Sequence, residues 1–220
     1  MSEAPVIAID GPSASGKGTV AQRVAQILGF HHLDSGALYR LVALAAAREG
    51  VDAKDEAAVA ALAVQLPARF EGEEVFFKNQ PVTDAIRTEE CSAAASFVAA
   101  LPQVRKALLK RQHAFRRPPG LVAEGRDMGS VVFPDAGLKV FLTASAEARA
   151  ERRHKQLKEK GIAATLAALL QDLRDRDARD ALRSVAPLKQ SPGARLLDTT
   201  SLSAEQAAAR IVGWYRGANE

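Results

Sequence analysis

The sequence of 220 residues has very little cysteine, no long apolar run and no large excess of charge of one sign. Because Cys91 is the only cysteine, an intramolecular disulfide and a cysteine-ligated metal cluster are both excluded. No apolar run approaches the ~20 residues needed to cross a bilayer, and the first residues show no basic stretch followed by an apolar core. We therefore expect no membrane partner and a reducing, cytoplasmic setting.

The net charge is only +4, from 30 basic and 26 acidic residues, and the surplus is local. Residues 149–183 contain ten basic and six acidic residues, and residues 149–160 alone contain six basic and two acidic residues. A nucleic-acid-binding protein would show a broad basic face, so no nucleic-acid partner is expected. The distribution favours a local site for an anion.

Short apolar segments alternate with helical patterns along the chain. Residues 6–9 are wholly apolar, as in a strand buried on both faces, and Gly29 is placed to end the helix that follows. Ser203 and Gln206 form a capping-box pair at the start of the last helix. Strands separated by helices predict an α/β fold, a parallel sheet covered by helices on both faces. Further strands are expected at about residues 30–33, 121–123, 138–142 and 195–197, and helices at about 17–28, 36–48, 146–160 and 203–217.

Residues 67–83 interrupt this alternation. Phe70, Val75, Phe76 and Phe77 lie among glycine and proline residues, which predicts a short antiparallel hairpin or meander lodged among helices. We expect this small sheet to belong to an insertion. The predicted organisation is a core of residues 1–34, 106–148 and 165–220, an insertion of residues 35–105, and a helical lid of residues 149–164.

Residues 11–19, GPSASGKGT, join the first predicted strand directly to the first helix and match the spacing GxxxxGK. Glycines let the backbone wrap a phosphate, successive N–H groups and the helix N-terminus face it, and Lys17 adds a cation. The alternative is a glycine turn that only joins strand to helix. Gly18 stands where Ser or Thr is usual, and this GKGT ending resembles nucleoside monophosphate kinases more than GTPases or motor ATPases. Phosphate binding is predicted for Gly11, Pro12, Ser13, Ala14, Ser15, Gly16, Lys17, Gly18 and Thr19.

Two further segments place charged residues after predicted strands: LDSGALYR at residues 33–40 and EGRDMG at residues 124–129. In open α/β sheets, ligands bind beyond the carboxyl ends of the strands, so both segments point to the same crevice as residues 11–19. An enzyme that moves a phosphoryl group between two nucleotides needs a second anion site of this kind.

The segments GPSASGKGT, LDSGALYR, EGRDMGSVVFPDA and RDRDARDALRSVAPL, in this order and over nearly the full chain, resemble the bacterial cytidylate kinases. The resemblance implies transfer of the γ-phosphoryl group of ATP to CMP or dCMP, with Mg²⁺, in pyrimidine nucleotide metabolism. It also implies that Ser35, Arg40, Arg126 and Arg183 bind the acceptor phosphate. It further implies that Ser96, Arg105 and Asp127 bind cytosine, and that Arg176 and Asp180 bind the pentose.

Simpler roles are open for several of these residues. Ser96 could only pack in its helix, and Arg126 and Asp127 could pair only with each other. Arg176, Asp180 and Arg183 could form a solvated network on a helix surface. We expect Thr19 to bind magnesium, with Asp34 or Glu124 contributing through a water molecule. The alternative is that these two carboxylates only cap nearby backbone groups.

The basic residues of the predicted lid are Arg149, Arg152, Arg153, Lys155, Lys158 and Lys160. A solvated helical face is the ordinary interpretation of such a run. Transfer to a nucleotide rather than to water requires closure of the site, however, and the family carries its lid at this place. We expect Arg149 and Arg153 to contact ATP phosphates.

A catalytic mechanism without a covalent intermediate follows, because phosphoryl transfer depends on positioning and on charge stabilisation. The residues expected to act in it are Lys17, Arg40, Arg126, Arg153 and Arg183. Two other functions are open: a kinase of the same fold for another nucleotide or a small alcohol, and a nucleotide-binding regulator that hydrolyses slowly. A regulator has no need of a second phosphate site, which disfavours it. A monomer is expected.

Overall fold

The computed structural model describes residues 3–72, 74–159, 161–183 and 185–217. The chain forms two compact units. The first unit contains Met1–Leu33 and Phe115–Glu220, and the second unit contains Asp34–Ala114. None of the helices in the described part of the chain is both long and apolar enough to span a membrane.

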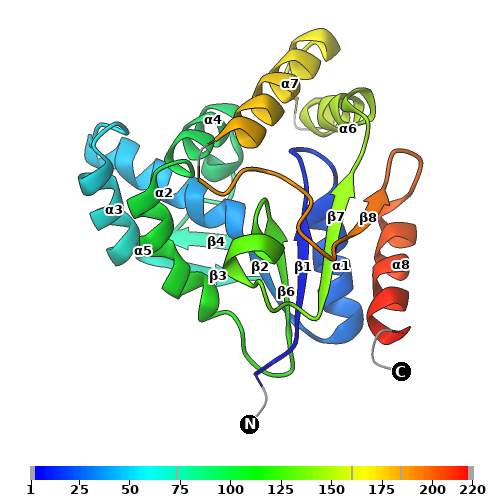
Figure 1. Ribbon diagram of the computed structural model, residues 1–220. Helices are drawn as coiled ribbons and strands as arrows, with labels where there is room; N and C mark the ends of the chain where they lie inside the picture. The colour runs from blue at the N-terminus through cyan, green and yellow to red at the C-terminus, as the bar shows by residue number, and fades with distance from the viewer. Residues whose placement is uncertain (1–2, 73, 160, 184, 218–220) are drawn as a thin grey trace. The chain divides into compact units, whose positions relative to one another are not determined.

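A five-stranded parallel sheet forms the centre of the first unit, with the strand order β2-β6-β1-β7-β8 (Figure 1). The central strand β1 is buried along its whole length, as its apolar sequence predicted. Its last residue, Asp10, lies opposite Gly125 of β6 and Phe141 of β7. The strands are β1 (Val6–Asp10), β2 (His31–Asp34), β6 (Leu121–Gly125), β7 (Leu138–Thr143) and β8 (Arg195–Asp198).

Helices α1 and α8 pack together and share one buried core with the strands. The predicted helix ends are confirmed: Gly29 caps α1 in the left-handed conformation, with a φ of 67°. Ser203 and Gln206 exchange the two capping-box hydrogen bonds, at 2.9 and 3.2 Å. The helices of this unit are α1 (Lys17–Leu28), α6 (Ala146–Glu159), α7 (Leu166–Leu182), α8 (Ala204–Gly217) and the π-helical turn η2 (Met128–Val132).

Helices α6 and α7 pack against each other around a small core of their own. Ala150 and Leu157 of α6 meet Leu169 and Leu173 of α7 in this core. Ala14, which precedes α1, packs against the same residues. The loop between β1 and α1 is therefore held by the apolar side chains of the helix pair.

The second unit is helical and contains a three-stranded antiparallel sheet, β3-β4-β5, which confirms the meander expected at residues 67–83. Helix α5 belongs to this unit, whereas the predicted insertion ended at residue 105. The reason is packing: α5 lies on α3, and the Arg111 guanidinium donates to the carbonyls of Leu66 and Ala68. The elements are α2 (Ser35–Glu49), α3 (Glu56–Gln65), β3 (Ala68–Glu71), β4 (Glu74–Phe77), β5 (Gln80–Pro81), η1 (Ala85–Arg87), α4 (Glu89–Val98) and α5 (Pro102–His113).

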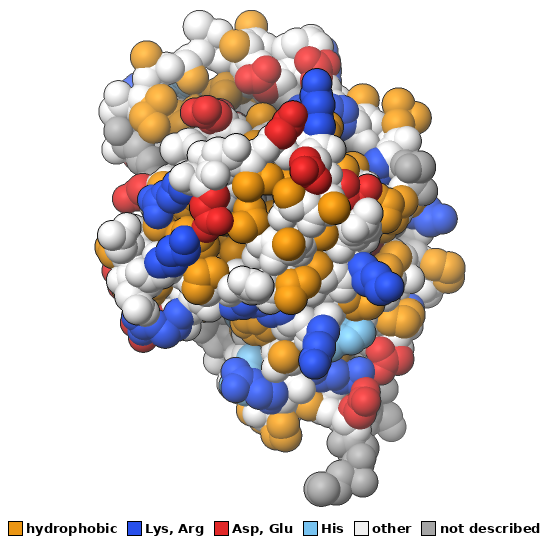
Figure 2. All heavy atoms as spheres, turned by 90° about the vertical axis from the view of Figure 1, so that its left-hand side faces the viewer, with side chains coloured by type: hydrophobic (Ala, Val, Ile, Leu, Met, Phe, Trp, Pro, Cys, Tyr) orange, Lys and Arg blue, Asp and Glu red, His pale blue; other side chains and the backbone are white. Residues whose placement is uncertain are grey.

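The surface seen in Figure 2 is mixed in charge. Among the described residues of that face, Lys and Arg side chains stand between acidic and apolar ones rather than in one broad basic field. This arrangement agrees with the small and local surplus of basic residues in the sequence.

Candidate active site

Residues 11–16 connect β1 to α1 and residues 17–19 form the first turn of α1, as their sequence predicted; we call residues 11–19 the phosphate loop. Gly16 has a φ of 85°, a left-handed conformation that favours glycine. A Cβ atom on Gly11 would lie 2.1 Å from the carbonyl oxygen of Leu142, so only glycine fits beside β7. Lys17 begins α1, and its Nζ donates to the carbonyl of Pro12 at 3.2 Å. The loop thus folds tightly around its own lysine.

Side chains from outside the phosphate loop hold two of its carbonyl groups. Arg149 of α6 donates to the carbonyl of Ser13 at 3.1 Å and to that of Ala144 at 3.1 Å. Its guanidinium also forms an ion pair with Asp177 of α7 at 2.6 Å. Arg149 is only 5% exposed, so this charge is bound by protein groups, and its contact with an ATP phosphate stays a prediction.

The second held carbonyl is that of Ser15. The Arg152 guanidinium of α6 donates to it at 3.3 Å, and the Thr199 hydroxyl donates to it at 3.2 Å. Thr199 follows β8 and is 3% exposed. Neither residue was assigned to the site from the sequence, because a threonine after a strand and one arginine among several carry no distinguishing signal.

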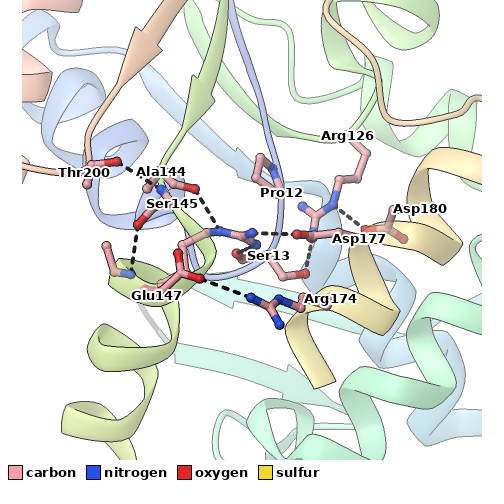
Figure 3. A network of polar contacts seen from close by, with 12 residues as sticks. Pro12, Ser13, Arg126, Ala144, Ser145, Glu147, Arg174, Asp177, Asp180 and Thr200 are labelled. Atoms are coloured by element: carbon pink, nitrogen blue, oxygen red, sulfur yellow. Dashed lines mark hydrogen bonds and ion pairs between the residues drawn. The ribbon is translucent and has the colours of Figure 1, made fainter. Parts of the chain in front are cut away.

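Arg126 joins the phosphate loop to α7. It follows β6, and its guanidinium donates to the Ser13 hydroxyl at 2.8 Å and to Oδ2 of Asp180 at 2.8 Å (Figure 3). Burial would raise the pKa of the Asp180 carboxyl, but the charge and hydrogen bond of Arg126 hold that pKa below its ordinary value. Arg126 therefore does not pair only with Asp127, and Asp180, at 5% exposed, is not part of a solvated surface network.

Asp10 was missed by the sequence reasoning, although a carboxylate at the end of a wholly apolar strand is a signal. It is 4% exposed and accepts hydrogen bonds from the backbone N–H groups of Met128 at 2.7 Å and Gly129 at 2.8 Å. These two donors open the π-helical turn η2, which directly follows Asp127. Burial raises the pKa of Asp10 to about 6, and the charge of Asp127 acts in the same direction.

Glu124 explains the unusual glycine of the phosphate loop. This carboxylate at the end of β6 is 5% exposed, and a Cβ atom on Gly18 would lie 3.1 Å from its Oε1. A larger residue at position 18 would therefore press on the carboxylate. The Oε1 atom also lies 3.3 Å from Nε2 of His32. Thr19 is exposed on the first turn of α1.

In the second unit, Asp34 and Arg40 form an ion pair of 2.6 Å at the start of α2. Asp34 also caps this helix by accepting from the N–H of Ala37 at 3.0 Å, which is the local role left open for it. Ser35 is buried at the first position of α2. Ion pairing with Asp34 orients Arg40, whose role at a phosphate stays a prediction.

Two predicted cytosine-binding residues lie on neighbouring helices of the same unit. Ser96 is half-buried on α4. Arg105 of α5 is 9% exposed, donates to the carbonyl of Ala99 at 3.3 Å and lies 5.9 Å from the centre of the Tyr39 ring. An arginine held over an aromatic ring has a restricted orientation, as a specific binding residue needs.

The remaining predicted residues lie on α6 and α7 and just after them. Arg153 is half-buried, with Nη1 at 3.5 Å from Oε1 of Gln156. Arg176 is half-buried on α7, and Arg183, just after it, donates to the carbonyl of Ala186 at 2.5 Å. Lys155 and Lys158 are exposed, and Lys160 lies outside the described residues.

A glycine-rich loop between the central strand of a parallel sheet and a helix, with arginines bonded to it, defines a phosphate-loop protein of the nucleotide-binding class. The structure of a gluconokinase from Sinorhizobium meliloti 1021 shares this fold, with a TM-score of 0.50 and 16% identity, covering 100% of this chain and 96% of that one.

Sequence comparison is more specific than the fold. The family model for cytidylate kinase matches residues 7–216, so the chain belongs to the cytidylate kinase family. A cytidylate kinase of Polynucleobacter asymbioticus is 57% identical over 218 residues, 99% of this chain and 99% of that protein. A cytidylate kinase of Bordetella bronchiseptica is 59% identical over 213 residues, 97% of this chain and 96% of that protein. The resemblance found in the sequence motifs is thereby confirmed.

Proposed function

We propose that the chain transfers the γ-phosphoryl group of ATP to CMP and dCMP, giving CDP and dCDP. Membership of the cytidylate kinase family supports this activity. The structural observation that carries it is Arg126, whose guanidinium lies 2.8 Å from the Ser13 hydroxyl of the phosphate loop. A cation at this place would lie between a donor phosphate on the loop and an acceptor phosphate, where charge builds up during transfer.

Two groups of residues would bind the two nucleotides. The phosphate loop, together with Arg149 and Arg153 of the proposed lid, would bind ATP. The acceptor would be bound at its phosphate by Ser35, Arg40, Arg126 and Arg183, at cytosine by Ser96, Arg105 and Asp127, and at the pentose by Arg176 and Asp180. Residues 35–105 would serve as the acceptor-binding insertion and residues 149–164 as the lid.

Specificity for cytosine would depend on a buried carboxylate. Asp127 is 3% exposed, so a base that meets it is away from water. Cytosine offers an amino group to such an acceptor, whereas uracil offers a carbonyl oxygen at the same ring position. With uracil, the carboxylate oxygen and the base carbonyl oxygen would face each other without a proton between them. This contact would discriminate strongly against uracil, because both oxygens lose their hydration.

The transfer itself would need no covalent intermediate. Lys17, Arg40, Arg126, Arg153 and Arg183 would orient the two phosphates in line and stabilise the charge of the transition state. The residues fit a magnesium ion that is bound mainly by phosphate oxygens and water, since the Glu124 carboxylate lies against Gly18 beside Thr19. Mg²⁺ would supply charge neutralisation between the phosphates of ATP. A monomer in the cytoplasm stays our prediction for the protein.

An ADP-release assay with a panel of acceptors tests this function. We expect turnover with CMP and dCMP and much weaker turnover with UMP, AMP and GMP. Equal turnover with UMP would refute the assignment of cytosine, and ADP release without any acceptor would favour the regulator.

The role of Asp127 is tested by Asp127→Asn against Asp172→Asn, an exposed residue on α7. We expect Asp127→Asn to raise the KM for CMP at least tenfold, because it removes the negative charge and replaces one of the two acceptor oxygens by a donor, and to change the KM for ATP little. Asp172→Asn should match the unmodified protein. An unchanged KM for CMP in Asp127→Asn would remove Asp127 from the site.

A further inference from the structure

A set of side chains on the protein side of the phosphate loop has no role in the proposed reaction. The carbonyl of Ser15 accepts from Nη1 of Arg152 at 3.3 Å and from the Thr199 hydroxyl at 3.2 Å. The same guanidinium donates to the carbonyls of Thr199 and Thr200, so it is itself fixed by the chain that follows β8. Both residues thus join the end of the last strand to the loop that follows the first.

The Thr199 side chain is built into this place. It is 3% exposed, and its backbone N–H donates to the carbonyl of Thr143 in β7 at 2.8 Å. The hydroxyl lies 3.0 Å from that same carbonyl and 3.2 Å from that of Ser15. The Thr143 carbonyl also accepts the Thr199 backbone N–H, so a hydroxyl proton given to Ser15 would not leave the Thr143 carbonyl without a donor.

Holding this carbonyl sets the direction of the next amide. In a planar trans peptide, the C=O and the N–H point to opposite sides, so a Ser15 carbonyl turned toward Thr199 turns the Gly16 N–H away from it. Two neighbouring peptides are held likewise: Arg149 binds the carbonyl of Ser13, and Lys17 binds that of Pro12. The Ser13 and Ser15 carbonyls are thus bound by side chains from outside the loop, which leaves the amides of the same peptides to face an anion.

We infer that Thr199 is a positioning residue for the phosphate loop, acting with Arg152 to aim the Gly16 N–H at a phosphate of ATP. This inference rests on the proposed binding of ATP by the loop. Gly16, with a φ of 85°, restrains its own backbone less than any other residue would, so contacts from outside the loop matter for its direction. Thr199 would act through the Ser15 carbonyl and not by contact with the nucleotide.

The test is Thr199→Val, which keeps the shape of the side chain and removes the hydroxyl. Thr199→Ser keeps the hydroxyl, and Thr200→Val is a matched control, because the Thr200 hydroxyl accepts from Ser145 at 3.0 Å and does not bond to the loop. Thr199→Ala, which adds no bulk, gives the same expectation should Thr199→Val fail to fold. The measurements are the dissociation constant for ATP by calorimetry without acceptor, and the KM values for ATP and CMP.

We expect Thr199→Val to weaken ATP binding and raise the KM for ATP by about tenfold, with the KM for CMP within twofold of the unmodified protein. Thr199→Ser and Thr200→Val should bind ATP as the unmodified protein does. ATP binding by Thr199→Val that is unchanged, or a loss shared equally with Thr200→Val or with CMP, would overturn the inference. Failure of the unmodified protein to bind ATP would instead refute the proposed function.

Discussion

Asp10 provides a quantitative test of the site, because its carboxylate is buried at the end of β1 under the start of η2. The two backbone donors at 2.7 and 2.8 Å favour the charged form, yet burial outweighs them and raises the pKa to about 6 from an ordinary value of 3.8. The change proposed is Asp10→Asn. This substitution keeps the size of the side chain and one acceptor oxygen, and it removes the titration.

The sign and size of the effect follow from the two pKa values. The folded protein holds the Asp10 proton more tightly than the unfolded chain does, so this group's contribution to stability is complete below about pH 4 and is lost as the pH rises through about 6. A difference of about two pKa units corresponds to about 3 kcal/mol, most of it between pH 4 and pH 7. Asp10→Asn should therefore gain about 2–3 kcal/mol relative to the unmodified protein over that interval.

Urea unfolding followed by circular dichroism at several pH values between 4 and 7 measures the difference between the two proteins. A difference that is constant with pH, or that grows in favour of the unmodified protein as the pH rises, would refute the argument. Asp180 contributes to the free energy of unfolding with the opposite pH dependence, so Asp180→Asn serves as the comparison. The pKa of Asp180 is lowered beside Arg126, so its contribution is present above about pH 4 and is lost as the pH falls below that.

Three glycines give further expectations. Gly120→Ala should lower the free energy of unfolding by about 1–3 kcal/mol in urea, because its Cβ would lie 2.5 Å from the Phe30 ring. Gly213→Ala, within α8 and with open space around it, should raise that free energy by about 0.5–1 kcal/mol. Gly18→Ala should lower kcat severalfold and leave the thermal midpoint within a few degrees, because its Cβ presses on the Glu124 carboxylate; unchanged kcat would contradict this crowding.

Much of the fold could be predicted because local patterns decide it. The wholly apolar run of β1 is buried throughout, and residues 67–83 form the expected small sheet. Helix α1 ends at Gly29 and helix α8 begins at the Ser203 capping box, as predicted. The insertion of residues 35–105 stays a prediction, whereas the second compact unit extends to Ala114 because α5 packs against α3. Such long-range packing leaves no local pattern in the sequence.

The candidate site also contains residues that local patterns predicted and residues that they did not. The phosphate loop and Arg126 stand in motifs, so their types and spacing were visible in the sequence. Asp10, Arg152 and Thr199 act through backbone groups far away in the chain, and backbone partners carry no residue type to search for. For Arg149 the basic helix predicted a phosphate contact, which stays a prediction; its ion pair with Asp177 and its bonds to two carbonyls left no sign in the sequence.

The contacts of Arg126 bear on how binding would respond to salt. Its charge is already neutralised by Asp180 and solvated by the Ser13 hydroxyl, so an arriving phosphate would exchange partners with these groups rather than meet a bare cation. The net attraction is then the difference between two similar contacts, and few counterions would be released from this arginine. Acceptor affinity should accordingly fall less steeply with ionic strength than the number of arginines at the site would suggest.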